Sequence, residues 1–259
     1  TVWRIYEGHT GPLLRSFFFL FTVTAAISGG IYKTYDGTAV SGSVTSYTTN
    51  VTGAALSGTL RYTTNSKNAG NYRTVDGSLK FTGLYSSDQQ GYDISYVASN
   101  PAMLTIGKAA LTVAGMTANN KTYDGGTVAT LSGGSLDGVI GSEAVTFSGQ
   151  TGTFADKNVG TGKAVAVSGI TLGGTDAGNY TVTQPTGLTA DISAKALTVT
   201  GMTATNKTYD GSTVATLSGG SLDGVIGSEI VTFSGQTGTF AAKNVGTGKT
   251  VSASGITLD

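Results

Sequence analysis

The chain consists of short runs of β-forming residues separated by turns that contain glycine. Ala110 to Val113, Val145 to Phe147 and Tyr180 to Val182 are rich in residues that favour the pleated surface of a strand. Gly-Gly, Asp-Gly and Ser-Gly pairs interrupt the chain about every eight to twelve residues, a spacing typical of sandwiches and barrels. No window carries a sustained helical period. The pattern therefore predicts an all-β protein.

A long internal repeat sets the domain organisation. The segment Lys121 to Gly125 (Lys-Thr-Tyr-Asp-Gly) recurs as Lys207 to Gly211, an offset of 86 residues (207 − 121), about the size of one small sandwich domain. The segment Leu136 to Glu143 recurs at Leu222 to Glu229, and a more divergent copy of the motif lies at Lys33 to Gly37. We therefore predict four parts. Residues 1–18 are an N-terminal segment that forms the exit of a preceding domain, and they are followed by repeat one (19–106), repeat two (107–193) and repeat three (194–259).

Repeat three stops before its last strands. At the repeat offset Asp259 aligns with Gly173, so the sequence predicts a C-terminally truncated domain and a natural protein that continues.

One motif favours a particular kind of sandwich. Residues 176–182 have the form Asp-x-Gly-x-Tyr-x-apolar, contributed by Asp176, Gly178, Tyr180 and Val182. In immunoglobulin-like domains this pattern marks the tyrosine corner, in which the Tyr hydroxyl bonds back to the main chain. Looser equivalents in repeat one are Ala69 to Tyr72 and Gly91 to Ile94. We expect tandem immunoglobulin-like β-sandwiches in an elongated rod, with β-grasp-like repeats as the alternative.

The Tyr-Asp-Gly motif itself is interpreted as structural. Asp-Gly is a strong tight-turn signal, and a preceding Tyr can bury its ring while its hydroxyl stays hydrogen-bonded. One identical motif per domain is also what a constraint of the fold predicts. The candidate turn and core-anchor residues are Tyr35, Asp36, Gly37, Tyr123, Asp124, Gly125, Tyr209, Asp210 and Gly211.

Composition argues against chemistry and against polyanionic partners. Lys+Arg 15 balances Asp+Glu 15, so the chain has no basic footprint for nucleic acid. Cysteine is absent and His9 is the single histidine, which removes thiolate metal sites and the usual general base. No Ser-His-Asp set or phosphate loop is recognisable, so we expect no enzyme and no cofactor.

Repeat two contains residue types that could form a structural calcium site or an intramolecular isopeptide bond, two features that stiffen surface rods. Oxygen ligands for a structural calcium ion are present, but they are spread out singly and no Asp-x-Asp-x-Asp-Gly run exists, so calcium remains a minor alternative. These residues are Asp124, Asp137, Glu143 and Asp176. An isopeptide bond is disfavoured because Lys157 and Asn158 are adjacent and their side chains cannot meet across a sheet.

The apolar run Phe17 to Phe21 imitates the core of a signal peptide. Glu7 precedes it, and the uncharged stretch after Arg15 is too short to span a bilayer. Its aromatic and β-branched content predicts a strand instead.

Taken together, these motifs resemble a known family. Lys-Thr-Tyr-Asp-Gly-x-Thr from Lys121, preceded by Leu-Thr-Val-x-Gly from Leu111, is similar to the YDG/MBG repeats of filamentous-haemagglutinin-type adhesins. The stretch Asp176 to Val182, followed by Gly-Leu-Thr-Ala-Asp-Ile from Gly187, adds to the resemblance. Residues 107–259 match closely and 19–106 more loosely, while the head from Val2 looks like the exit of the β-solenoid of these proteins.

The resemblance implies a secreted or cell-surface protein of bacteria. It implies export by the two-partner route through a dedicated outer-membrane transporter, and a filament used for attachment, aggregation or biofilm. Our first hypothesis is a stalk of tandem domains. The alternatives are that the repeats bind a host glycan or protein, or that they self-associate through edge strands.

Overall fold

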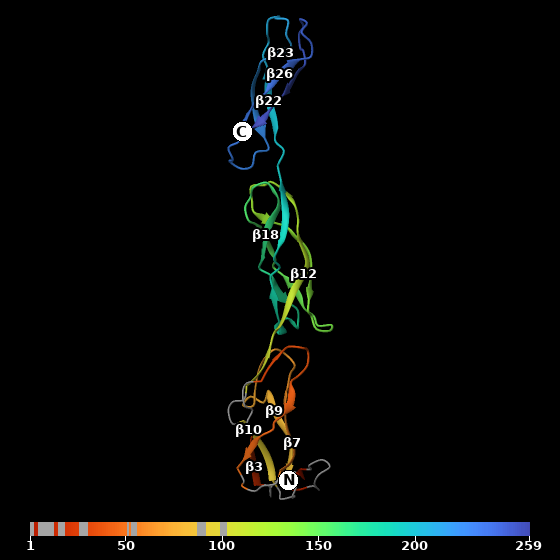
Figure 1. Cartoon of the computed structure of the whole chain (residues 1–259), viewed down its shortest axis with the longest axis vertical. Helices are drawn as coiled ribbons and strands as arrows, with labels where there is room; N and C mark the ends of the chain where they lie inside the picture. The colour runs from red at the N-terminus through yellow and green to blue at the C-terminus, as the bar shows by residue number, and fades with distance from the viewer. Residues whose placement is uncertain are drawn as a thin grey trace. The chain divides into compact units, whose positions relative to one another are not determined.

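The computed structural model describes residues 3–4, 13–14, 19–25, 31–50, 52, 56–86, 92–98 and 103–259. Throughout these residues the fold consists of strands and turns, with a single turn of 3₁₀ helix, η2 (Ala177–Asn179) (Figure 1). The prediction of an all-β protein is confirmed. Within the same residues no helix has the length and apolar character needed to cross a membrane.

The chain forms two compact units, and both take residues from repeat two. Unit 1 comprises Thr1–Met116, Gly134–Gln150 and Gly169–Pro185. Unit 2 comprises Thr117–Gly133, Thr151–Ser168 and Thr186–Asp259. Repeat two is therefore shared between the two units.

Unit 1 is built from small sheets of two or three strands. Their orders are β10 (Tyr92–Ala98), β3 (Phe19–Ala25), β6 (Tyr47–Thr49); β4 (Ile31–Thr34), β11 (Met103–Gly107), β8 (Gly70–Arg73); β5 (Ser41–Ser43), β7 (Leu56–Thr64), β9 (Leu79–Ser86); β1 (Trp3–Arg4), β2 (Leu13–Leu14); and β16 (Thr146–Ser148), β19 (Thr171–Gly173). A further sheet has the order β15 (Leu131–Asp137), β12 (Ala109–Ala118), β20 (Tyr180–Thr183). The predicted strands of repeat two fall in β12, β16 and β20.

The part of the signal-peptide-like run that the structure describes, from Phe19 to Phe21, lies in strand β3, as predicted, while Phe17 and Phe18 lie outside the described residues. Strand β3 pairs in parallel with β10, from Phe19 opposite Tyr92 to Ala25 opposite Ala98. Apart from β1 and β2, the predicted N-terminal segment 1–18 lies outside the described residues, and so does Gly91 of the looser tyrosine-corner equivalent.

The core of unit 1 crosses the boundary between repeats one and two. One cluster joins Leu104 and Ile106 of repeat one to Leu111 and Tyr180 of repeat two, all nearly inaccessible to solvent. A second cluster lies entirely within repeat one. It contains Val23, Val44, Leu60, Phe81 and Leu84. Because burial of apolar area dominates folding energy, the two repeats share part of their stabilisation.

Unit 2 holds the largest sheet and the whole of repeat three. The five-stranded sheet has the order β13 (Lys121–Thr122), β21 (Leu188–Ser193), β18 (Gly160–Ser168), β17 (Thr151–Phe154), β14 (Val128–Ala129). Repeat three contributes β22 (Thr198–Ala204) with β24 (Leu217–Asp223); β23 (Val214–Ala215), β26 (Thr237–Phe240), β27 (Val251–Ser254); and β25 (Phe233–Ser234) with β28 (Thr257–Leu258). Alternation along β17 and β18 buries Phe154, Val165 and Val167, as expected for strands covered on one face.

Candidate functional site

The Asp and Gly of the motif form the same turn in all three repeats. In repeat two the Asp124 carboxylate accepts a hydrogen bond from the Gly126 N–H at 2.9 Å and pairs with Lys121 at 2.8 Å. Gly125 has a φ of +76°, a conformation that glycine adopts without a Cβ penalty. The equivalent ion pairs in repeats one and three are Lys33–Asp36 and Lys207–Asp210. These neighbours lower the pKa of Asp36 and of Asp210 to about 2, with the lysine as the main cause.

The Tyr of the motif in repeat one contacts repeat two. Tyr35 is only 3% exposed, and its hydroxyl donates to Oε1 of Glu143. Lys67 of repeat one pairs with the same carboxylate oxygen at 2.8 Å, and the Tyr180 hydroxyl donates to Oε2 at 2.6 Å. We call Tyr35, Lys67, Glu143 and Tyr180 the first junction. All four residues belong to unit 1.

Close packing accompanies these polar contacts. A Cβ built on Gly37 would lie 3.1 Å from Cγ2 of Ile140, so glycine also allows the loop of repeat two to approach. The Ile140 N–H donates to the Tyr180 hydroxyl at 3.1 Å. The Tyr35 and Tyr180 rings meet edge to face with centroids 5.4 Å apart, a favoured aromatic geometry.

The electrostatics of the first junction fix its protonation state. The Lys67 ammonium, followed by the Tyr180 and Tyr35 hydroxyls, lowers the pKa of Glu143 to about 2. Burial, followed by the hydrogen bond to Glu143 and then its charge, raises the pKa of Tyr35 to about 12. At neutral pH the carboxylate is therefore ionised and the phenol neutral, so the bond between them is charge-assisted.

The same arrangement recurs between repeats two and three, inside unit 2. Tyr123 donates to Oε1 of Glu229, and Lys157 pairs with that oxygen at 2.5 Å. A Cβ on Gly125 would lie 2.9 Å from Cγ2 of Ile226. We call Tyr123, Lys157 and Glu229 the second junction. The Lys157 ammonium is the main cause of the lowered pKa of Glu229.

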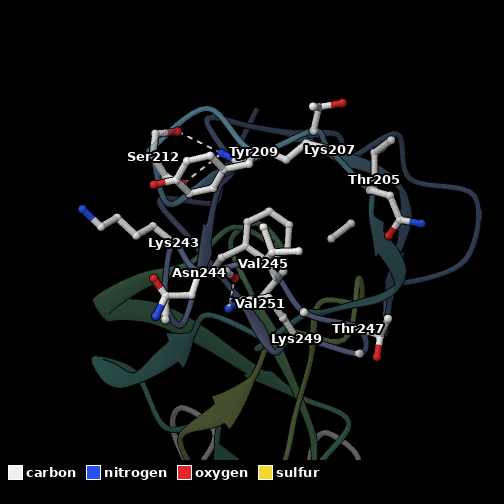
Figure 2. Close-up of a pocket in the computed structure, with 17 residues that line it drawn as sticks. Thr205, Lys207, Tyr209, Ser212, Lys243, Asn244, Val245, Thr247, Lys249 and Val251 are labelled. Atoms are coloured by element: carbon white, nitrogen blue, oxygen red, sulfur yellow. Dashed lines mark hydrogen bonds between the residues drawn. The ribbon is translucent and has the colours of Figure 1, made fainter.

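The third copy of the motif keeps the turn without these contacts. Tyr209 is 58% exposed, and nothing lies within 4 Å of a Cβ built on Gly211. Among the described residues no acidic side chain forms an ion pair with Lys243, the counterpart of Lys157 (243 − 157 = 86). Figure 2 shows Tyr209 and Lys243 at the edge of a groove in repeat three.

The tyrosine-corner motif also takes part in the first junction. The Tyr180 hydroxyl accepts its main-chain bond from Ile140, 40 residues upstream, and Asp176 accepts from the Ala144 N–H at 2.9 Å. Gly178 lies in η2. The local corner geometry occurs instead at Tyr72, whose hydroxyl donates to the Asn68 carbonyl at 2.5 Å.

Sequence reasoning missed the partners of the tyrosines. The sequence pattern indicates Glu143 only as a possible calcium ligand and Lys157 only as a possible partner in an isopeptide bond. Over the part of the chain that the structure describes, no three acidic or histidine side chains gather closely enough to hold a metal ion. The signal that could have identified these partners is their recurrence: Glu143 and Lys157 reappear at the repeat offset as Glu229 and Lys243.

Comparison with known proteins identifies the repeats. The model of the YDG domain family matches residues 107–187 and 193–259. No curated protein and no solved structure matches the chain. Because the matched stretches include both closely similar copies of the Tyr-Asp-Gly motif and cover more than half of the sequence, the chain belongs to the YDG domain family.

Proposed function

We propose that this chain is a stalk segment of a secreted bacterial surface adhesin of the filamentous-haemagglutinin type. The YDG repeats space a binding region from the cell, in support of attachment, aggregation or biofilm, and they catalyse no reaction. In this proposal the protein reaches the surface through an outer-membrane two-partner-secretion transporter.

One observation carries the proposal: the Tyr-to-Glu contact is made twice, at equivalent positions of successive repeats. The Tyr35–Glu143 bond spans 108 residues and the Tyr123–Glu229 bond spans 106. A site that binds an external ligand needs accessible groups, whereas these groups are used in contacts between neighbouring repeats. A spacer needs such contacts, because they restrict bending between adjacent domains.

The alternative of glycan or protein binding by each repeat has less support. It requires a solvent-exposed aromatic at one position of every domain. The motif tyrosine does not meet this requirement, since Tyr35 is 3% exposed and Tyr209 is 58% exposed.

Small-angle scattering on the 259-residue chain tests the spacer role. We expect a narrow set of conformers for the parent chain and a broader set for the double variant Glu143→Gln, Glu229→Gln, which weakens both junctions. Tyr209→Phe is the matched control and leaves the scattering unchanged. A parent chain that behaves as freely jointed domains overturns the proposal, and specific binding of the purified chain to a glycan array favours the alternative.

A further inference from the structure

Two buried tyrosines from different repeats share one carboxylate at the first junction. Tyr35 belongs to repeat one and is 3% exposed, and Tyr180 belongs to repeat two and is 2% exposed. The Tyr35 hydroxyl donates to Oε1 of Glu143, and the Tyr180 hydroxyl donates to Oε2 at 2.6 Å. Each phenol proton therefore points at an oxygen of the same ionised group.

The rings of the two tyrosines are also in contact. Their centroids are 5.4 Å apart and their planes are inclined at 82°, so the edge of one ring faces the other ring. Both rings belong to the core cluster that contains Leu104, Ile106 and Leu111, each of which is at most 1% exposed. Because a close-packed core keeps its side chains in fixed positions, the two rings stay next to each other and water has little access to them.

The shared carboxylate favours oxidation of both phenols. Oxidation of a phenol to its radical releases the hydroxyl proton, and a carboxylate accepts that proton more readily than a water molecule does. Burial, followed by the hydrogen bond to Glu143, raises the pKa of both Tyr35 and Tyr180, so both phenols carry their protons at neutral pH. The Glu143 side chain is 11% exposed and that of its partner Lys67 is 46% exposed, so the carboxylate can pass each proton on to solvent.

We propose that Tyr35 and Tyr180 form a dityrosine cross-link between repeats one and two when the chain meets a one-electron oxidant derived from hydrogen peroxide. Each phenol loses its proton to Glu143 in turn and one electron to the oxidant. The two radicals form a carbon–carbon bond between their ortho positions, and the hydrogens at those positions move to the phenol oxygens. One hydrogen peroxide takes up the two electrons and two protons and becomes two water molecules.

Burial is compatible with this step. Electron transfer needs no direct contact with the oxidant, whereas coupling needs the two rings to be adjacent. The core therefore protects the radicals from other partners without preventing their formation.

The link gives the first junction a covalent connection. It closes a loop of 145 residues (180 − 35), and the sequence contains no cysteine that could form a disulfide instead. A cross-link that closes a long loop restricts the unfolded chain and so favours the folded one. Contact with peroxide outside the cell rests on the proposed function, whereas the cross-link itself does not.

Oxidation of the purified 259-residue chain tests the proposal. The chain is treated at micromolar concentration with a haem peroxidase and hydrogen peroxide, and the monomers are digested with trypsin and analysed by mass spectrometry. Cleavage after lysine and arginine places Tyr35 in peptide 34–61 and Tyr180 in peptide 164–195. We expect these two peptides, joined through Tyr35 and Tyr180 with the loss of two hydrogen atoms, to be the main intrachain product. Monomers without a link, or with other tyrosine pairs linked as often, overturn the proposal.

Three variants test the role of the carboxylate. Glu143→Gln keeps the ring pair and removes the proton acceptor; because an amide makes weaker hydrogen bonds than a carboxylate, the yield of the link is expected to fall at least about tenfold. Lys67→Gln weakens the junction but keeps the carboxylate, so its yield is expected to fall less. Tyr209→Phe removes a tyrosine that is 58% exposed and is the matched control with unchanged yield.

Two results for the variants overturn the proposal. One is a yield for Glu143→Gln equal to that of the parent chain, and the other is an equal fall for Glu143→Gln and Lys67→Gln, which assigns the effect to loosened packing. Failure here is distinct from failure of the stalk proposal, because the scattering experiment measures the chain without an oxidant.

Discussion

Removing one hydroxyl at the first junction gives a sharp test of its energetics. Tyr35→Phe keeps the ring in place and removes the donor to the ionised Glu143. A hydrogen bond to a charged group contributes about 1.5–3 kcal/mol, and at 3% exposure water does not replace it. Glu143 retains Lys67 and Tyr180 as partners, which places the expected loss of stability in the lower part of that range, about 1.5–2 kcal/mol.

Amide exchange in residues 139–145 reports this loss locally. In this loop Ile140 N–H donates to Tyr180, Glu143 N–H to the Ile140 carbonyl, and Ala144 N–H to Asp176. These protons exchange when the junction opens. Since about 1.4 kcal/mol corresponds to a factor of ten, Tyr35→Phe is expected to speed their exchange roughly ten- to thirtyfold.

The same substitution at the other two motif tyrosines, Tyr123→Phe and Tyr209→Phe, provides comparisons within the same chain. The first is expected to act in the same direction on residues 225–229, with a smaller effect because the Glu229 side chain is 30% exposed and water can replace the lost donor. Tyr209 makes no junction contact, so Tyr209→Phe is expected to change stability by less than about 0.5 kcal/mol. If Tyr209→Phe cost as much as Tyr35→Phe, the motif tyrosine would serve its own domain and the reasoning would be refuted.

Two further predictions concern the glycine of the motif and pH. Gly125→Ala and Gly211→Ala both place a side chain at positive φ, but only at Gly125 does the Cβ meet a neighbour, Ile226 at 2.9 Å. We therefore expect Gly125→Ala to lower the free energy of unfolding in urea by about 1–3 kcal/mol more than Gly211→Ala does. Equal losses for the two variants would contradict the packing argument. The pKa of Glu143 is lowered, so its contribution is complete above the ordinary carboxyl pKa of 4.5 and is lost as pH falls toward about 2. The pKa of Tyr35 is raised, so its contribution to stability is present below pH 10 and is lost as pH rises through about 12. Amide exchange in residues 139–145, corrected for intrinsic rates, should therefore accelerate at both the acidic and the alkaline extreme and not between them.

The sequence was sufficient to predict what is local. The alternation of β-formers and glycine turns predicts the strands, and the described part of the apolar run, from Phe19, forms β3 as predicted. The Asp-Gly pair predicted a turn, and the structure places Asp124 in one through bonds to Lys121 and Gly126. These features depend on residues within a few positions of one another, which is the range over which single-sequence patterns carry information.

The junctions depend on contacts that a pattern does not encode. Tyr35 and Tyr209 have the same neighbours in sequence, Lys-Thr before and Asp-Gly after, yet one is buried and the other exposed. Tyr35 is covered by Glu143, 108 residues away, whereas among the described residues no acidic side chain bonds to the Tyr209 hydroxyl. Likewise the tyrosine-corner pattern located Tyr180 but not the bonds of its hydroxyl to Ile140 and Glu143.

The contacts also explain why the compact units do not coincide with the sequence repeats. The bonds of the two junctions span 108 and 106 residues, both longer than the 86-residue period, so each reaches from one repeat into the next. The core cluster of Leu104, Ile106 and Leu111 does the same at the first boundary. Each unit therefore contains one junction together with the parts of both repeats that form it. A repeat then has two different ends, the Tyr-Asp-Gly turn at one and the Val-Ile-Gly-Ser-Glu loop at the other. Because the turn of one repeat contacts the loop of the next, a sequence must keep both the Tyr of the turn and the Glu of the loop to preserve the junction.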